Sequence, residues 1–480
     1  MKYSTLVGRK NEVSILKDAL ESNESELISV IGRRRVGKTF LVQTTYRKDI
    51  DFEITGIQHA SKKEQLENFA IVLNLYTRSP LPIAPPSTWL EAFRLLILYL
   101  ERIKKDRKRI IFFDELPWLA SHKSGFLKAF GFFWNSWAVK NQVVVVICGS
   151  AASWMIQKVV HDKGGLYNRI TKRIRLRPFT LFEVESFLQE RRIIVERYQI
   201  VELYMVTGGI PHYLKEIRKG ESVAQNIDRI CFDSSNGMLY DEFQQLYPSL
   251  FDRPENHIAI IHQLAARLSG HSRKEISDST GIPKGGGLSK TLSELLQSDF
   301  ISEYLPFGKK KRELRYRLTD EYSLFYLKFI QKLKHEGLGI WKNFSQTPTY
   351  NAWSGYAFEN ICLKHLPQIK QSLGISGIYS THSSYYHPGS EDMDGCQIDL
   401  LIDRNDKIIN LFEIKFSSSE FILTKSYAKA INRKIALFKY YAQTKKQIFL
   451  TFITPFGLLP NEQSKGWVDK ELSLDDLFLP

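Results

Sequence analysis

Eight residues near the start of the chain have the types and spacing that bind phosphate. They read G-x-x-x-x-G-K-[ST] and run Gly32, Arg33, Arg34, Arg35, Val36, Gly37, Lys38 and Thr39, with Phe40 next. The glycines allow backbone N–H groups to turn inward toward phosphate oxygens. Lys38 would place its ammonium against the β- and γ-phosphates, and Thr39 would give its hydroxyl to Mg²⁺. The spacing predicts that the chain binds a nucleoside triphosphate with Mg²⁺.

A second polar pair, Asp114 and Glu115, ends an apolar run that begins after Arg109. Ligands of parallel α/β sheets bind at the carboxyl ends of the strands, where this pair is expected to lie. Asp114 would hold the Mg²⁺, and Glu115 would polarise the attacking water, so hydrolysis is predicted as well as binding. The chain has no Asn-Lys-x-Asp motif for reading guanine, which favours ATP over GTP.

Alternating strand and helix patterns would position these groups. The β-branched run 27–31 precedes the glycine loop, and further strands are predicted over 52–57, 109–114 and 143–148. Helical spacing separates them over 61–75, 89–102 and 126–137. The order predicts a three-layer α/β domain with a parallel sheet over residues 1–178. Ser150 follows the last of these strands and is predicted to be a sensor of the γ-phosphate, a helix N-cap, or both.

The middle of the chain is predicted to form two helical domains. Residues 179–250 are expected to be a helical lid, with Gly209 and Pro211 in a rigid turn. Residues 251–335 read as three helices and a basic hairpin, which describes a winged helix-turn-helix. Its third helix would read the major groove, and Lys309–Arg312 would meet phosphates; use of the module for protein packing is the open alternative.

A second group of chemical residues lies in the C-terminal domain, over residues 345–480. Glu359 has helical surroundings, Asp399 lies in one predicted strand, and Glu413 and Lys415 lie in the next. Alternation along that strand puts Glu413 and Lys415 on one face. Asp399 and Glu413 could chelate Mg²⁺ or Mn²⁺, and the lysine could position or activate a water for phosphodiester attack. Tyr427 and Lys434 would either line a backbone-binding face or be solvated.

Composition narrows the class of protein. The 480 residues are 43% hydrophobic and 25% charged, with four widely spaced cysteines that predict reduced thiols rather than a disulfide frame or a zinc site. No apolar run is long enough for a transmembrane helix and no signal segment is visible, so we expect a cytoplasmic protein without membrane contact. The net charge of +15 favours a nucleic-acid partner, with DNA preferred.

The glycine loop, the Asp114–Trp118 segment, the turn at 208–211 and the C-terminal carboxylate set together resemble the archaeal-type ATPase family. Its members look like STAND-type proteins of the AAA+ superfamily. The resemblance implies a P-loop ATPase core, a helical lid, a winged helix and a domain similar to PD-(D/E)XK nucleases, which have a restriction-endonuclease-like α/β fold. It also implies that Gly209 and Pro211 approach the adenine and that Gly8, Arg9 and Glu12 precede the nucleotide pocket.

Two functions from different classes follow. In the first, ATP hydrolysis controls a metal-dependent nuclease domain that acts on DNA or RNA. In the second, ATP binding drives a switch or scaffold that recruits protein partners or forms a homo-oligomer. The C-terminal domain then binds nucleic acid or protein without cleaving it.

Overall fold

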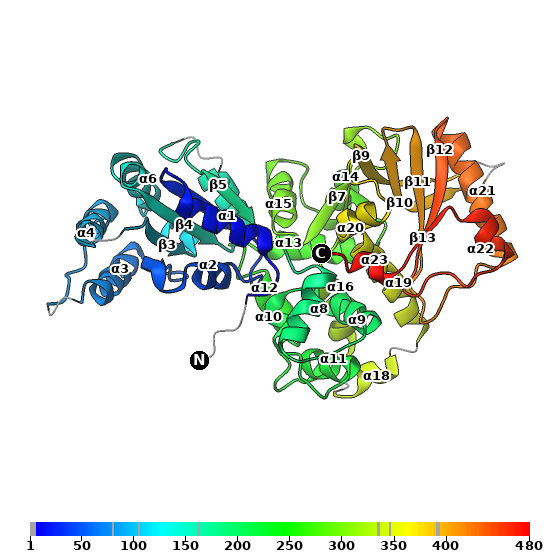
Figure 1. Cartoon of the computed structure of the whole chain (residues 1–480), viewed down its shortest axis with the longest axis horizontal. Helices are drawn as coiled ribbons and strands as arrows, with labels where there is room; N and C mark the ends of the chain where they lie inside the picture. Colours follow the sequence, from blue (N-terminus) through cyan, green and yellow to red (C-terminus); the bar gives the residue numbers. More distant parts are fainter. Residues whose placement is uncertain are drawn as a thin grey trace. The chain divides into compact units, whose positions relative to one another are not determined.

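The computed structural model describes residues 6–78, 81–103, 106–160, 164–333, 337–344, 347–389 and 394–480. The chain divides into two compact units, Met1–Pro178 and Phe179–Pro480, and many of their elements are labelled in Figure 1. Across the described ranges, no helix combines the length and the apolar character needed to cross a membrane. All four cysteines are buried free thiols.

The first unit is built on a five-stranded sheet in the order β2-β3-β4-β1-β5, and every pair in it is parallel. The strands are β1 Glu26–Ile31, β2 Ile50–Thr55, β3 Arg109–Asp114, β4 Val143–Gly149 and β5 Lys172–Arg175. The helices that connect them are α1 Lys10–Glu21, α2 Lys38–Tyr46, α3 Lys62–Thr77, α4 Trp89–Arg102, α5 Leu116–Leu119, α6 Phe126–Ser136 and α7 Ala152–Met155. The predicted parallel α/β sheet is therefore confirmed.

Side chains on both faces of this sheet are buried, as its apolar strands require. Ile111 and Phe113 of β3 face a core that α3, α4 and α6 cover, and phenylalanines dominate that core. Phe93 of α4, for example, stacks on Phe133 of α6 with ring centroids 5.0 Å apart. The buried Ile110 and Phe112 alternate with these residues and point to the opposite face. The central strands of the sheet are therefore packed on both faces, and the polar groups at its carboxyl edge extend from this core.

The second unit begins with helices and a small antiparallel sheet. The first helices are α8 Leu181–Glu190, α9 Arg197–Thr207, α10 Pro211–Leu214, α11 Val223–Phe232 and α12 Glu242–Leu246. The sheet has the order β6-β8-β7 and lies with α13 to α15. The bounds are α13 Glu255–Ala266, β6 His271–Ser272, α14 Arg273–Thr280, α15 Gly286–Gln297, β7 Ile301–Tyr304 and β8 Arg315–Leu318.

The hairpin between β7 and β8 is attached to the C-terminal part of the unit. The backbone N–H of Phe307 donates to the carbonyl of Ser384 at 2.8 Å. The Phe307 ring also packs on Phe438, with centroids 5.4 Å apart. The base of this basic hairpin is therefore engaged in protein packing, which is one of the two predicted uses of the module.

The C-terminal part holds a five-stranded sheet in the order β13-β12-β11-β10-β9. Strands β9, β10 and β11 pair antiparallel, and β11, β12 and β13 pair parallel. Helix α19 precedes the sheet, and α21 connects β11 to β12. The bounds are α16 Glu321–Phe325, α17 Gln331–Leu333, α18 Ile340–Phe344, α19 Pro348–Lys364, α20 Leu366–Ser372, β9 Ser380–His387, β10 Cys396–Arg404, β11 Ile408–Ile414, α21 Lys425–Ala442, β12 Gln447–Ile453, α22 Glu462–Trp467, β13 Lys470–Leu472 and α23 Leu474–Leu477.

Candidate functional site

The glycine loop lies between β1 and α2, at the carboxyl end of the sheet. Gly37 has φ 93° and Arg35 has φ 71°, so the loop turns through left-handed backbone before α2 begins. A Cβ on Gly32 would lie 2.3 Å from the carbonyl oxygen of Leu176, which no side chain can do. The first glycine of the motif is thus required by the packing of the loop against the chain after β5.

The Lys38 side chain curls back over the loop. Its Nζ donates to the carbonyl oxygens of Gly32 at 2.9 Å and of Arg33 at 3.0 Å. Burial lowers the pKa of Lys38, and the nearby Glu115 and Asp114 carboxylates oppose that shift. Lys38 is only 6% exposed, so its charge acts in a poorly solvated place. An ammonium held in such surroundings is a strong site for a phosphate anion.

Thr39 and Asp114 come together although they lie on different elements. The Thr39 hydroxyl donates to Asp114 Oδ2 at 2.8 Å. Burial raises the pKa of Asp114 to about 6, and the hydrogen bond from Thr39 opposes the shift. A carboxylate that is buried and under-compensated in this way favours a cation beside it. The hydroxyl and the carboxylate oxygen are both hard donors, so their chemistry fits the Mg²⁺ of a bound nucleotide.

Glu115 is held by Ser150 across the carboxyl edge of the sheet. The Ser150 backbone N–H and hydroxyl both donate to Glu115 Oε2, at 3.0 Å and 2.8 Å. Glu115 itself has φ 46°, which directs the chain away from β3 into α5. Residue Ala151, rather than Ser150, is the N-cap of α7, so the N-cap prediction for Ser150 is wrong. Sequence reasoning identified Ser150 as a polar strand end but missed its partner.

The predicted adenine contacts lie in the other unit. Gly208 and Gly209 have φ 60° and 68° in the turn between α9 and α10, and Pro211 begins α10. A Cβ on Gly209 would meet the carbonyl oxygen of Phe179 at 2.4 Å, so a glycine is needed there for packing. That Gly209 and Pro211 approach adenine stays a prediction.

The second predicted group is gathered by β10 and β11. Leu400 pairs with Phe412, and the same antiparallel register extended by one residue sets Asp399 opposite Glu413. The pairing of β10 with β9 shifts by one residue between Ile398 and Leu401, so Asp399 lies in an irregular, bulge-like part of the strand. Bulges re-aim side chains and are common next to active sites. Three of the four predicted residues, Asp399, Glu413 and Lys415, therefore share one face of the sheet.

Glu413 is enclosed by donors. Lys434 approaches one of its oxygens at 2.8 Å and Lys415 approaches the other at 3.0 Å, while the Tyr427 hydroxyl donates to it as well. Burial would raise the pKa of Glu413, but the two lysines lower it overall. Burial and Glu413 together raise the pKa of Tyr427 to about 12. Tyr427 and Lys434 thus bind a carboxylate, a role that the sequence did not reveal.

Glu359 and Asp399 face a cavity of about 440 Å³ that also exposes three arginines. Burial and the Asp399 charge raise the pKa of Glu359 to about 8. The arginines are Arg315 and Arg317 of β8 and Arg267, which follows α13. Arg315 and Arg317 are two residues apart on the strand, so their side chains lie on the same face of β8. Arg317 also lies 5.3 Å from the centre of the Tyr304 ring, in cation–π contact. The cavity thus places carboxylates against a basic wall of three arginines, two of which, Arg267 and Arg315, also pair with Glu275 at 2.5 Å and 3.7 Å.

These carboxylates fit a divalent cation only in part. Glu359 and Asp399 are hard oxygen donors that repel each other, which a cation would relieve. Glu413 is already neutralised by its lysines. Over the ranges that the structure describes, no three His, Cys, Asp or Glu side chains gather closely enough to hold a metal ion. The metal role of Asp399 and Glu413 stays a prediction.

A family model matches the part of the chain that contains the glycine loop. Residues 6–217 match the family model described as an ATPase domain predominantly from Archaea. A protein of Methanocaldococcus jannaschii, described as uncharacterized, is 25% identical over 462 residues, which are 92% of this chain and 96% of that protein. That relative extends the similarity beyond the ATPase domain to nearly the whole chain.

Among solved structures, the Walker-type ATPase of Pyrococcus abyssi covers 68% of this chain and 96% of its own, with a TM-score of 0.50 and 19% identity. The ORC2 protein of Aeropyrum pernix covers 69% of this chain and 95% of its own, with a TM-score of 0.40 and 15% identity. The chain therefore carries an ATPase domain of this archaeal type at residues 6–217, and its parallel sheet has the fold of a P-loop ATPase.

Proposed function

We propose that the chain binds ATP with Mg²⁺ through residues 32–40 and hydrolyses it. The observation that supports this most directly is the hydrogen bond from Thr39 to Asp114, because it joins the end of the glycine loop to the acidic strand end. Lys38 would neutralise phosphate charge as it shifts toward the leaving group. The bound Mg²⁺, held by Thr39 and Asp114, would supply Lewis-acid stabilisation of the phosphate oxygens.

Glu115 would orient and polarise the attacking water. Ser150 donates two hydrogen bonds to one of its oxygens, which leaves the other oxygen, Oε1, to accept from that water. Ser150 acts here through Glu115 and is a positioning residue. In the same proposal Gly209 and Pro211 line the adenine.

The test is ATP hydrolysis and nucleotide binding by Lys38→Ala beside Lys17→Ala. Lys17 is an exposed lysine of α1 and serves as the matched control. Loss of the Lys38 ammonium is expected to lower the affinity for a fluorescent ATP analogue by at least about a hundredfold, since a buried site loses its phosphate counter-charge. Unchanged affinity in Lys38→Ala would exclude this site as the phosphate site.

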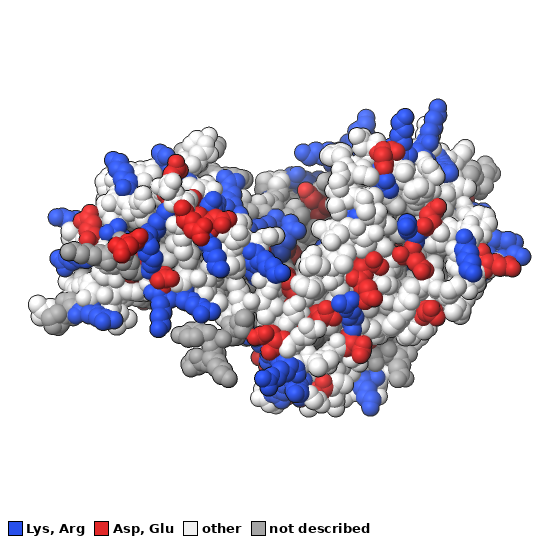
Figure 2. All heavy atoms as spheres, viewed as in Figure 1, with Lys and Arg blue, Asp and Glu red and all other residues white. Residues whose placement is uncertain are grey.

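For the second unit we propose that residues 251–335 form a winged helix and residues 345–480 a nuclease-like domain that acts on DNA or RNA under the control of the nucleotide state. The support is the order helix, three antiparallel strands, helix, parallel strand, with Asp399 and Glu413 directly beyond the paired residues Leu400 and Phe412. The basic wall of the 440 Å³ cavity would hold a nucleic-acid phosphate beside Asp399 and Glu359. In Figure 2 Lys and Arg are spread over the visible face of both units, so a local cavity is a more specific site than the net charge.

A cleavage assay with Mg²⁺ or Mn²⁺ tests that proposal. Plasmid DNA, single-stranded DNA and RNA are incubated with wild type, with Asp399→Asn and with Asp406→Asn, a control carboxylate in the exposed turn after β10. Cleavage that is lost only in Asp399→Asn supports the nuclease. If wild type cleaves none of the three polymers at any nucleotide state, the nuclease proposal is wrong.

One observation favours the alternative function. Glu413 is already neutralised by Lys415 and Lys434, which makes it a poor metal ligand. The chain would then be a STAND-type switch that ATP closes to recruit a protein partner or a second copy, and its C-terminal domain would only bind nucleic acid. An ATP-dependent change in sedimentation, without cleavage of any polymer, would support this reading.

A further inference from the structure

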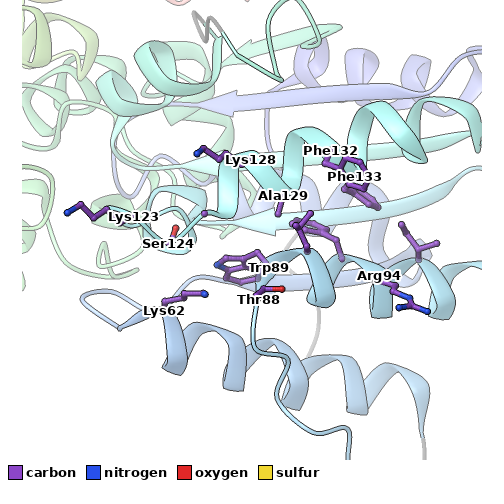
Figure 3. A pocket seen from close by; sticks show the side chains of 14 residues that line it. Lys62, Thr88, Trp89, Arg94, Lys123, Ser124, Lys128, Ala129, Phe132 and Phe133 are labelled. Carbon is purple, nitrogen blue, oxygen red and sulfur yellow. The ribbon is translucent and has the colours of Figure 1, made fainter.

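The first unit contains a large apolar groove outside the nucleotide site. It lies between α4 and α6, has a volume of about 840 Å³, and is shown in Figure 3. Apolar residues that line it are Leu90, Phe93, Ile97, Ala129, Phe132 and Phe133. None of the residues that bind phosphate or Mg²⁺ in the proposed ATPase lines this groove. It therefore needs an explanation of its own.

Part of this apolar surface faces the solvent. The Phe132 side chain is 62% exposed and Leu90 is 56% exposed, although both belong to helices whose other faces are buried in the core. A cluster of exposed apolar side chains along a groove marks a site of association more often than isolated exposed residues do. Two adjacent helices with an apolar floor also provide the shape that receives a third helix.

All charged residues that line the groove are basic: Lys62, Arg94, Lys123 and Lys128. Among the residues that the structure describes, Lys62, Lys123 and Lys128 have no ion-pair partner, whereas Arg94 lies near enough to Glu91 for its charge to act on that carboxylate. In Figure 3 Lys62 and Lys123 lie toward one end of the groove, and Arg94 lies toward the other. Charges at both ends suit a ligand that carries negative charge along its length, rather than one with a single anionic head.

A buried donor adds an independent indication of a ligand. Trp89 lines the groove, is 2% exposed, and its indole N–H has no hydrogen-bond partner in the part of the chain that is described. In Figure 3 the indole nitrogen points toward the end where Lys62 lies. Buried tryptophans normally find an acceptor for this N–H. The acceptor here would come from the ligand.

We propose that the groove between α4 and α6 binds an acidic, amphipathic helix of a partner protein. Leucine or phenylalanine side chains of the partner would cover Phe132 and Leu90. Its glutamates or aspartates would pair with Lys62, Lys123, Lys128 and Arg94, and one oxygen would accept from Trp89. The N-termini of α4 and α6 lie at the end with Lys62 and Lys123, so both helix dipoles add to the positive potential there.

The test uses a fluorescent helical peptide of about 14 residues, with leucines spaced to form one apolar face and glutamates on both flanks. A second peptide carries lysine in place of every glutamate. Fluorescence anisotropy is measured with the full-length protein. We expect the acidic peptide to bind, and the lysine peptide to bind at least about tenfold more weakly, because its charges repel the rim.

Substitutions in the groove locate the binding. Phe132→Ser and Lys128→Glu should each weaken the acidic peptide by at least about tenfold, while the exposed controls Leu75→Ser and Lys17→Glu should leave it unchanged. Trp89→Phe keeps the buried ring but removes the donor, and should weaken binding by about threefold to tenfold. The thermal midpoint of unfolding should stay within a few degrees of wild type in all three groove variants, which shows that the first unit is folded.

Three results would overturn the proposal. The first is that the acidic peptide does not bind or that both peptides bind equally, and the second is that the groove variants bind like wild type. The third is displacement of the acidic peptide by dodecanoate at comparable affinity, which would make the groove a lipid site. These outcomes are independent of the ATPase, because none of the groove residues belongs to the nucleotide site.

Discussion

The stability of the second unit should fall in mild acid because of His365. This side chain is 1% exposed and lies between α19 and α20. Its Nε2 accepts from the backbone N–H of Leu181 at 3.0 Å, so its Nδ1 must carry the proton that it donates to the carbonyl of Ile361 at 2.8 Å. The neutral ring thus joins the first residue of α8 to α19. Protonation of Nε2 would destroy the bond to Leu181 and place a charge in the interior.

Burial lowers the pKa of His365 from 6.5 to about 4. The folded pKa is below the unfolded one, so between these values the unfolded chain binds the extra proton and acid favours unfolding. The stabilisation of the folded state by neutral His365 is complete above the unfolded pKa. It is lost as the pH falls from there toward about 4. The full shift corresponds to about 3 kcal/mol, and from about pH 7.5 to about pH 5.5 the expected loss is about 1.3 kcal/mol.

The assay is urea unfolding of wild type and of His365→Gln at both pH values. Glutamine can still accept from Leu181 but does not titrate, so the difference between the two proteins isolates this residue from the other carboxylates and histidines. The unfolding free energy of wild type minus that of His365→Gln should fall by about 1.3 kcal/mol between about pH 7.5 and about pH 5.5. His365→Asn repeats the comparison if the glutamine variant does not fold. A difference that is constant with pH to within about 0.5 kcal/mol would refute the reasoning.

Three further predictions concern the nucleotide site. Glu115→Gln should bind ATP with wild-type affinity yet hydrolyse it at least about a hundredfold more slowly, as measured by phosphate release, because the amide polarises water poorly. Ser150→Ala should lower kcat by about tenfold with little change in KM, because the Ser150 hydroxyl donates to Glu115. A change mainly in KM would instead indicate direct contact with the nucleotide. Gly32→Ala should lower the thermal midpoint and abolish binding of a fluorescent ATP analogue, because its Cβ would meet the Leu176 carbonyl at 2.3 Å; wild-type binding and midpoint would contradict this.

Much of the first unit could be predicted from local patterns. The strand before Gly32 and the strand that ends at Asp114 are apolar runs that can be recognised from a few neighbouring residues, and they appear as β1 and β3. The loop could be recognised because phosphate binding needs several residues at fixed, consecutive positions. Local signals of this kind survive in a sequence without any knowledge of the fold.

The remaining features depend on contacts between distant residues. Ser150 reaches Glu115 across two neighbouring strands, and no spacing in the sequence predicts that hydrogen bond. Lys434 is the cation of α21 that turns to Glu413, whereas its neighbour Arg433 pairs with Asp394. Propensity assigns both to a helix surface and cannot say which side chain faces the sheet. Packing decides it, because α21 must cover β10 and β11 with its apolar side.

The two carboxylate sites differ in what surrounds the acid, and this limits what each can do. The Glu115 carboxylate accepts hydrogen bonds from the neutral Ser150 and lies near the Lys38 ammonium, which itself donates to the loop carbonyls of Gly32 and Arg33. Glu413 is paired with Lys415 at 3.0 Å. Burial alone would lower the pKa of Lys415, but the Glu413 carboxylate raises it. An ammonium held in this way stays protonated near neutral pH and cannot take a proton from water. Of the two roles predicted for Lys415, the arrangement supports positioning and charge stabilisation, and it argues against service as a general base.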